Sequence, residues 1–134
     1  MRKFPFLSDM QAMIMLRISL SVVFLAHALV RLFTEGSIAT FTTYLSNKGF
    51  VLSGAIVWAI TVFEIVGGIS MAIGYGVRWL AAGFIGMLIA GIFIIHLRQG
   101  WFVGEHGSGG CEYSFILIIS LLVVAAHAKN RKRI

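Results

Sequence analysis

The run Ser53–Gly74, SGAIVWAITVFEIVGGISMAIG, decides the fold class of this chain of 134 residues. It holds a single charged residue, Glu64, and is as long as the roughly 20 apolar residues that an α-helix needs to cross a bilayer. Comparable apolar runs occupy about 12–33, 79–97 and 111–128. A transmembrane β-barrel would show weaker, alternating strands of about ten residues. The sequence therefore predicts an all-α integral membrane four-helix bundle, formed as a single domain over residues 1–134.

The composition supports the membrane class and limits the kinds of binding partner to be expected. The chain is 59% hydrophobic and 12% charged, whereas a soluble domain carries about 25% charged residues. Its net charge of +6 lies largely at the two ends, which indicates membrane topology rather than binding of nucleic acid. The only cysteine, Cys111, excludes an internal disulfide and a CxxC redox or zinc motif. The lipid bilayer is therefore the first expected partner, and homo-oligomerisation is left open.

The distribution of lysine and arginine predicts the orientation. Seven basic residues belong to the two termini and the turn near 74–78: Arg2, Lys3, Arg78, Lys129, Arg131, Lys132 and Arg133. Only Lys48 and Arg98, with Arg31 at a helix end, belong to the other side. Because cytoplasmic loops carry the excess of basic residues, both termini are predicted to be cytoplasmic. The segment 34–52 on the opposite side is long enough for a short interfacial helix.

Ionisable residues inside the apolar runs are the candidates for function. Such residues are rare in membrane helices and usually face the interior of the bundle with a partner. They are Arg17, His27 and Arg31 in the first run, Glu64 in the second, His96 in the third, and Glu112 and His127 in the fourth. The alternative for Arg17 and Arg31 is that they extend to the membrane surface as interface anchors.

Glu64 is the strongest candidate because it lies near the centre of its run, away from water. A carboxylate there must either take up a proton or find a cation. Judged by depth, Arg17 and His27 lie about one and a half turns to either side of it, and the sequence does not choose between them. Arg31 and Glu112 are expected near the outer face, where they can pair or offer hydrogen bonds to a ligand.

The segment Gly104–Tyr113, GEHGSGGCEY, resembles a site but has a simpler interpretation. It lacks the lysine and the preceding strand of a phosphate-binding loop. Glu105, His106, Cys111 and Glu112 could bind a metal by residue type, yet their spacing matches no zinc site, and no metal is predicted. The glycines provide a turn, and the turn delivers Glu112 to the outer mouth of the bundle.

The order of these motifs resembles the DoxX family over almost the whole chain. The matching positions are Leu16-Arg17, His27-x-x-x-Arg31, Glu64-x-x-Gly67-Gly68, Gly74-x-Gly76-x-Arg78, His96 and Gly109-Gly110-x-Glu112-Tyr113. Gly67, Gly68, Gly74, Gly76, Arg78, Gly109 and Gly110 are expected to shape the turns and close contacts. Three features depart from the family pattern. Arg31 replaces the usual lysine, a proline before the second run is absent, and the residues after Val124 lack the usual GPG-like ending.

The resemblance implies a multi-pass protein of the bacterial inner membrane, linked to redox or thiol stress. Some members are described as membrane partners of superoxide dismutase and a sulfurtransferase, and related archaeal polypeptides are subunits of a thiosulfate:quinone oxidoreductase. The leading hypothesis is a membrane subunit of a redox-related complex that binds a quinone or another lipid-soluble ligand among Glu64, Arg17, His27, Arg31, His96, Glu112 and Tyr113. No haem or flavin motif is evident, so the subunit is not expected to be active alone. The alternatives are a small proton-coupled transporter using Glu64, and a structural assembly factor.

Overall fold

The computed structural model describes residues 4, 6–104 and 109–130, and every described element is a helix. The elements are α1 (Asp9–Phe33), α2 (Ser37–Asn47), α3 (Ser53–Ile73), α4 (Val77–Gly91), the π-helix η1 (Ile92–His96), the 3-10 helix η2 (Leu97–Gln99) and α5 (Glu112–Asn130). The prediction of an all-α fold is confirmed. The basic residues Arg2, Lys3, Arg131, Lys132 and Arg133, together with Glu105 and His106, lie outside the described residues.

Three helical stretches of the described chain are long and apolar enough to cross a membrane. They are α1, α3 and the continuous stretch Val77–Gln99, while the apolar part of α5, Glu112–Ala128, is shorter. The first helix begins at Asp9 because Ser8 and Gln11 form a capping box. The Ser8 hydroxyl accepts from the Gln11 N–H at 3.3 Å, and the Gln11 side-chain oxygen accepts from the Ser8 N–H at 2.9 Å.

The short helix expected within 34–52 is present as α2. It starts after Gly36, whose φ of 74° places it in the left-handed region that glycine adopts without strain. Leu45 is buried where α2 packs against α3 and α1. The Tyr44 hydroxyl donates to the Ile94 carbonyl oxygen at 3.2 Å, so α2 also contacts η1. The short helix α2 thus packs against the longer helices α1 and α3 rather than lying apart from them.

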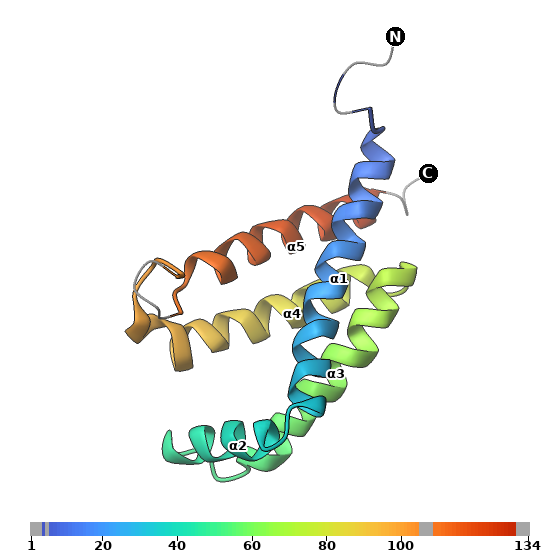
Figure 1. Ribbon diagram of the computed structural model, residues 1–134. Coiled ribbons are helices and arrows are strands. Elements are labelled where there is room, and N and C mark those ends of the chain that lie inside the picture. The colour runs from blue at the N-terminus through green and yellow to red at the C-terminus, as the bar shows by residue number, and fades with distance from the viewer. Residues whose placement is uncertain (1–3, 5, 105–108, 131–134) are drawn as a thin grey trace.

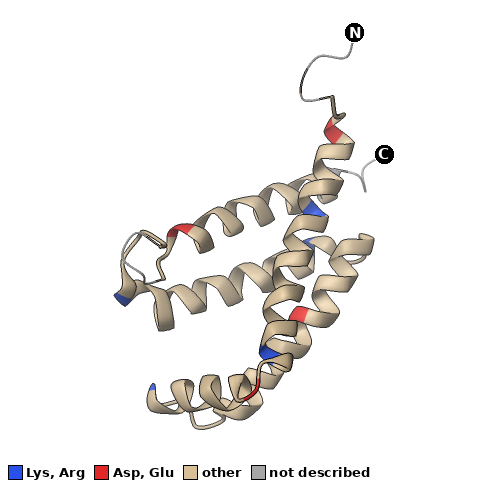
Figure 2. Cartoon of the chain, in the orientation of Figure 1, with Lys and Arg blue, Asp and Glu red and all other residues tan. Residues whose placement is uncertain are grey.

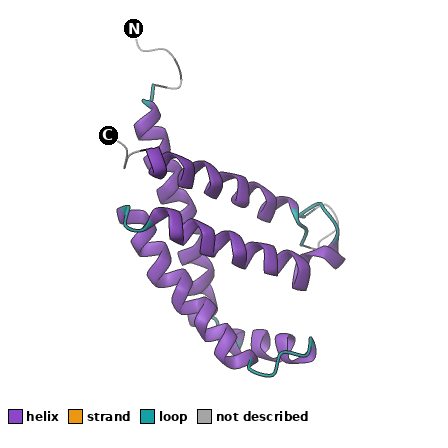
Figure 3. Ribbon diagram, turned by 180° about the vertical axis from the view of Figure 1, so that it is seen from behind, coloured by secondary structure: helices purple, strands orange, loops and turns teal. Residues whose placement is uncertain are grey.

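The long helices form two antiparallel pairs (Figure 1). One pair is α1 with α3 and the other is α4 with α5; the pairs meet where α1 contacts α5 and α3 contacts α4. The start of α1, the end of α5 and the turn Gly74–Gly76 lie at one end of the molecule, which we call the terminal end. The view from behind in Figure 3 shows the same grouping, with α2 and the connection between η2 and α5 away from that end. That the terminal end is cytoplasmic stays a prediction.

The core is aromatic and depends on close helix contacts. The rings of Phe24 on α1 and Phe84 on α4 stack with their centroids 3.9 Å apart. A Cβ at Gly67 would lie 3.1 Å from Cζ of Phe84, and a Cβ at Gly68 would lie 2.9 Å from Cγ of Leu25. The two neighbouring glycines of α3 therefore face different helices, and they allow α3 to approach α4 and α1 at the same level.

The turn between α3 and α4 has the backbone geometry expected from its two glycines. Gly74 and Gly76 have φ of 90° and 59°, the left-handed region that ends one helix and starts the next. A Cβ at Gly74 would lie 3.0 Å from Nη1 of Arg17, so this glycine also makes room for an arginine of α1. The turn is therefore part of the packing at the terminal end.

Candidate functional site: a polar cavity around Glu64

Glu64 is paired with Arg31. The Arg31 Nη1 atom donates to Oε2 of Glu64 at 2.7 Å and to Oγ1 of Thr61 at 2.9 Å. The Thr61 hydroxyl donates in turn to the Val57 carbonyl oxygen at 2.8 Å, within α3. The side chains of Arg31 and Glu64 are only 14% and 6% exposed. This is a nearly buried, charge-assisted hydrogen bond, so the interpretation of Arg31 as an interface anchor is wrong.

The prediction that Arg17 could be the partner of Glu64 is also wrong, and the reason is the offset between two helices. The Arg17 Nη2 atom donates to the Ala72 carbonyl oxygen at 3.3 Å, near the end of α3. The part of α1 before Arg17 therefore extends beyond the end of α3, as Figure 1 shows. Figure 2 shows the resulting distribution of charge, with a basic and an acidic position facing each other on α1 and α3.

Phe41 of α2 completes the surroundings of Arg31 and was missed by the sequence analysis. Its ring centroid lies 5.3 Å from Cζ of Arg31, a distance at which the ring face attracts the cation. A signal was present, because Phe41, Tyr44 and Leu45 follow the spacing of one helix face. That pattern indicates that the short helix turns one side toward the long ones.

Glu64 lines a cavity of about 240 Å³ that lies between α1, α3, α4, η1 and the start of α5. Its lining residues are Phe24, His27, Glu64, Met87, Leu88, His96, Val103, Gly109, Gly110, Tyr113, Ser114 and Leu117. The cavity brings together four of the predicted site residues: Glu64, His27, His96 and Tyr113. Arg17 and Glu112 are not among its lining residues, and Arg31 contributes through its bond to Glu64.

His96, which lines this cavity, has a hydrogen-bonding atom without a partner in the described chain. Its Nδ1 is buried and has no hydrogen-bond partner in the part of the chain that the structure describes. A Cβ at Gly109 would lie 2.8 Å from Oε1 of Gln99 and 3.7 Å from that nitrogen, so only a glycine lets the chain pass this close to η1 and η2. His96 ends the π-helix η1, and π-helical turns inside helices are frequent at functional sites. A buried ring nitrogen without a partner costs free energy unless a ligand or water satisfies it.

Glu112 has a different role from the one predicted. Its Oε1 accepts from the Val103 N–H at 2.8 Å, and its own N–H donates to the Trp101 carbonyl oxygen at 3.0 Å. Glu112 therefore holds the connection between η2 and α5 in place, and it does not pair with Arg31. The close approach of Gly110 to Trp101 and Phe102 brings Val103 beside the start of α5, where its N–H reaches the Glu112 carboxylate.

The glycine turn before Glu112 is tightly packed. A Cβ at Gly110 would lie 2.4 Å from the carbonyl oxygens of both Trp101 and Phe102, which no side chain can tolerate. Cys111 is buried, as expected for a small packing residue, and its N–H donates to the Gly100 carbonyl oxygen at 3.1 Å. Among the described residues no three His, Cys, Asp or Glu side chains come together as a set of metal ligands.

Comparison with known proteins agrees with the motifs. The sequence model of the DoxX family matches residues 12–97, which include α1, α2, α3, α4 and η1. The searches of curated proteins and of solved structures found no match. The match covers more than half of the chain and includes the Arg31–Glu64 pair and His96. The chain is a membrane protein that belongs to the DoxX family.

Proposed function

We propose that this protein is the membrane subunit of a redox-linked complex and that its cavity binds a quinone-like, lipid-soluble ligand. The observation that carries the proposal is that His96, whose buried Nδ1 has no partner among the described residues, lines the same cavity as Glu64. Ligand sites in proteins combine apolar walls with a few fixed polar groups, and this cavity has that composition. Its walls include Phe24, Met87 and Leu117.

The polar groups suit a ring with oxygen substituents. A quinone carbonyl accepts hydrogen bonds and a quinol hydroxyl donates them, and an imidazole nitrogen can serve as donor or acceptor. The Ser114 hydroxyl offers a further polar contact from α5. The volume of about 240 Å³ is below the range of roughly 300–1,000 Å³ typical of drug-sized ligands, so a single ring suits it better than a large cofactor.

Some of the side chains that line the cavity are exposed. Tyr113 is 44% exposed and lies at the start of α5, and His27 on α1 is exposed as well. A ligand with an apolar tail can leave its tail among the exposed apolar side chains of α5, which include Phe115 and Ile116. The proposal includes redox partner subunits because of the family resemblance. These subunits would exchange electrons with the bound ligand.

Binding of decylubiquinone tests the proposal. The purified protein in mild detergent is titrated with decylubiquinone, and the quenching of tryptophan fluorescence is followed. We expect saturable binding that His96→Ala weakens roughly tenfold, because one hydrogen bond in a buried site contributes about 1–2 kcal/mol. Glu35→Gln is the control, since Glu35 is an exposed acid outside the cavity.

Non-saturable partitioning that is identical in the wild type and His96→Ala would remove the ligand proposal. The structural assembly factor would then gain, because the Arg31–Glu64 pair also links α1 to α3 without any ligand. Proton release that depends on substrate and is lost in Glu64→Gln would instead support the proton-coupled transporter.

A further inference from the structure

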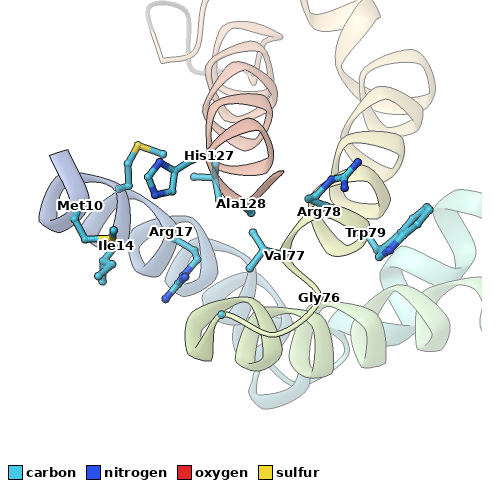
Figure 4. Close-up of a pocket in the computed structure, with 12 residues that line it drawn as sticks. Met10, Ile14, Arg17, Gly76, Val77, Arg78, Trp79, His127 and Ala128 are labelled. Atoms are coloured by element: carbon cyan, nitrogen blue, oxygen red, sulfur yellow. The ribbon is translucent and has the colours of Figure 1, made fainter. Parts of the chain in front are cut away.

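A second cavity lies at the terminal end, where α1, the turn Gly74–Gly76, α4 and α5 meet. It has a volume of about 220 Å³ and is separate from the cavity around Glu64, with which it shares no lining residue. Three basic side chains from three helices line it: Arg17 of α1, Arg78 of α4 and His127 of α5. Figure 4 shows these residues placed around Val77 and Ala128.

Two of the three basic side chains have buried nitrogen atoms without partners. Nε of Arg17 and Nε2 of His127 are buried and make no hydrogen bond within the described residues. Among the described residues, the Arg17 side chain makes one hydrogen bond, from Nη2 to the Ala72 carbonyl oxygen at 3.3 Å. Its guanidinium thus keeps most of its donors for another acceptor.

No carboxylate neutralises this cluster in the part of the chain that the structure describes. The ion pair found there joins Arg31 to Glu64, in the other cavity, and neither Arg17 nor Arg78 takes part in one. A guanidinium with a buried, unpaired Nε is costly unless an anion balances it. Because no counter-ion is found among the described residues, an external anion is the candidate to balance this cluster.

We propose that this cavity binds a phosphate-bearing anion, and that its source is the headgroup of an anionic phospholipid. Arginine presents its donors in a fork that matches phosphate oxygens, which suits Arg17 to bind the phosphate. In Figure 4 the Arg17 and His127 side chains lie on one side of Val77 and the Arg78 side chain extends away from it on the other, so we assign the phosphate to Arg17 and His127 and a supporting charge to Arg78.

The surroundings favour a lipid over free phosphate. Ile14 and Trp79 line the same cavity and are 36% and 84% exposed, so apolar side chains lie beside the basic group. A phospholipid can place its phosphate against Arg17 and its acyl chains along these side chains. The terminal end is also the end predicted to be cytoplasmic, and the cytoplasmic leaflet carries the anionic lipids.

Native mass spectrometry of the full chain tests the proposal. The protein in detergent is offered equal amounts of phosphatidylglycerol and phosphatidylcholine, and the retained lipid is identified. We expect the wild type to retain phosphatidylglycerol preferentially, and Arg17→Gln to lower its retention roughly tenfold. Arg98→Gln is the matched control, because Arg98 is an exposed arginine in η2 and lines neither cavity.

Three further experiments keep the result decisive. In the first, excess inorganic phosphate is added to the lipid-bound protein, and its effect on Tm is measured in the absence of lipid. If phosphate displaces the lipid, and if it raises Tm of the wild type but not of Arg17→Gln, the anion site is supported but its ligand is soluble phosphate and not a lipid. Arg17→Lys keeps the charge but lacks Nε, so we expect its retention to lie between those of the wild type and Arg17→Gln. Hydrogen exchange is also measured for the wild type in bilayers of each lipid, which requires no variant. We expect the amides of residues 74–79 to exchange more slowly in phosphatidylglycerol than in phosphatidylcholine.

Equal retention of the two lipids overturns the proposal, provided that free phosphate also leaves Tm unchanged. An undiminished preference in a folded Arg17→Gln protein overturns it as well. If both Arg17 variants fail to fold, hydrogen exchange of the wild type decides. Equal exchange rates at residues 74–79 in the two bilayers would overturn the proposal, and slower exchange in phosphatidylglycerol would support it.

Discussion

Removing the charge of Glu64 should destabilise the protein more than any other single replacement of an acidic residue. Glu64→Gln keeps the size of the side chain but leaves the guanidinium of Arg31 without its counter-ion. Removing one partner of a buried ion pair costs about 3–5 kcal/mol. Because the Arg31 side chain is 14% exposed and keeps its bond to Thr61 and its contact with Phe41, we expect the low end, about 3 kcal/mol.

A double-mutant cycle separates the pair from other effects. Arg31→Met is expected to cost a similar amount, because it leaves a nearly buried carboxylate unpaired. The double variant Glu64→Gln/Arg31→Met should cost less than the sum of the single variants by at least about 1 kcal/mol. The free energy of unfolding is measured by titration with SDS in mixed micelles, followed by circular dichroism. Glu35→Gln, at an exposed position, serves as the control and should change it by less than about 0.5 kcal/mol.

The reasoning is refuted if Glu64→Gln costs less than about 1 kcal/mol and the two substitutions are additive. Such a result would mean that the 2.7 Å contact contributes nothing beyond the interactions of each side chain with its other surroundings. It would also mean that the contact with Arg31 of α1 is not what holds the Glu64 side chain of α3 in its position beside the cavity.

Three further substitutions or reactions test the rest of the fold. Gly110→Ala should destabilise the connection before α5 and lower Tm, because its Cβ would lie 2.4 Å from two backbone carbonyl oxygens. Gly86→Ala is the control: a Cβ there meets nothing within 4 Å, so Tm should stay unchanged or rise. Equal effects of the two substitutions on Tm would contradict the close packing at Gly110. Ser8→Ala removes the capping box of α1 and should cost about 1 kcal/mol, with faster hydrogen exchange confined to the first turn; unchanged exchange there would show that the cap does not hold the helix end. Cys111 is buried, so N-ethylmaleimide should label it slowly in the folded protein and quickly after denaturation, and equal rates would show that the thiol is accessible.

The helices could be predicted from the sequence because their signals are local. The length of the apolar run and Gly74 at its end predict α3 to within one residue. The observed start of α1 at Asp9 follows from the capping box of Ser8 and Gln11, a local signal that lies outside the apolar run. Such signals depend on hydrogen bonds and dihedral angles within a few residues, so no knowledge of the partner helix is needed.

The contacts between helices could not be predicted in the same way. Helical periodicity shows which residues share a face, but not how far one helix slides along another. Aligning the centres of the two spans placed Glu64 between the depths of Arg17 and His27, whereas the actual offset places Arg31 beside Glu64 and Arg17 near Ala72. The role of Glu112 was missed for a related reason, since its partner Val103 belongs to an irregular segment without periodicity.

The Arg31–Glu64 pair also has a consequence for the way the chain enters the membrane. During synthesis α1 emerges before α3, so Arg31 reaches the bilayer before its counter-ion has been made. Arg31 is near the end of α1, where a long basic side chain can extend to water in the meantime. Glu64 has no such route, and a charge at the centre of an inserting helix costs about 2.5–3.5 kcal/mol. We therefore expect α3 to insert efficiently only beside an α1 that is already in place, so that the two helices enter the membrane as one hairpin.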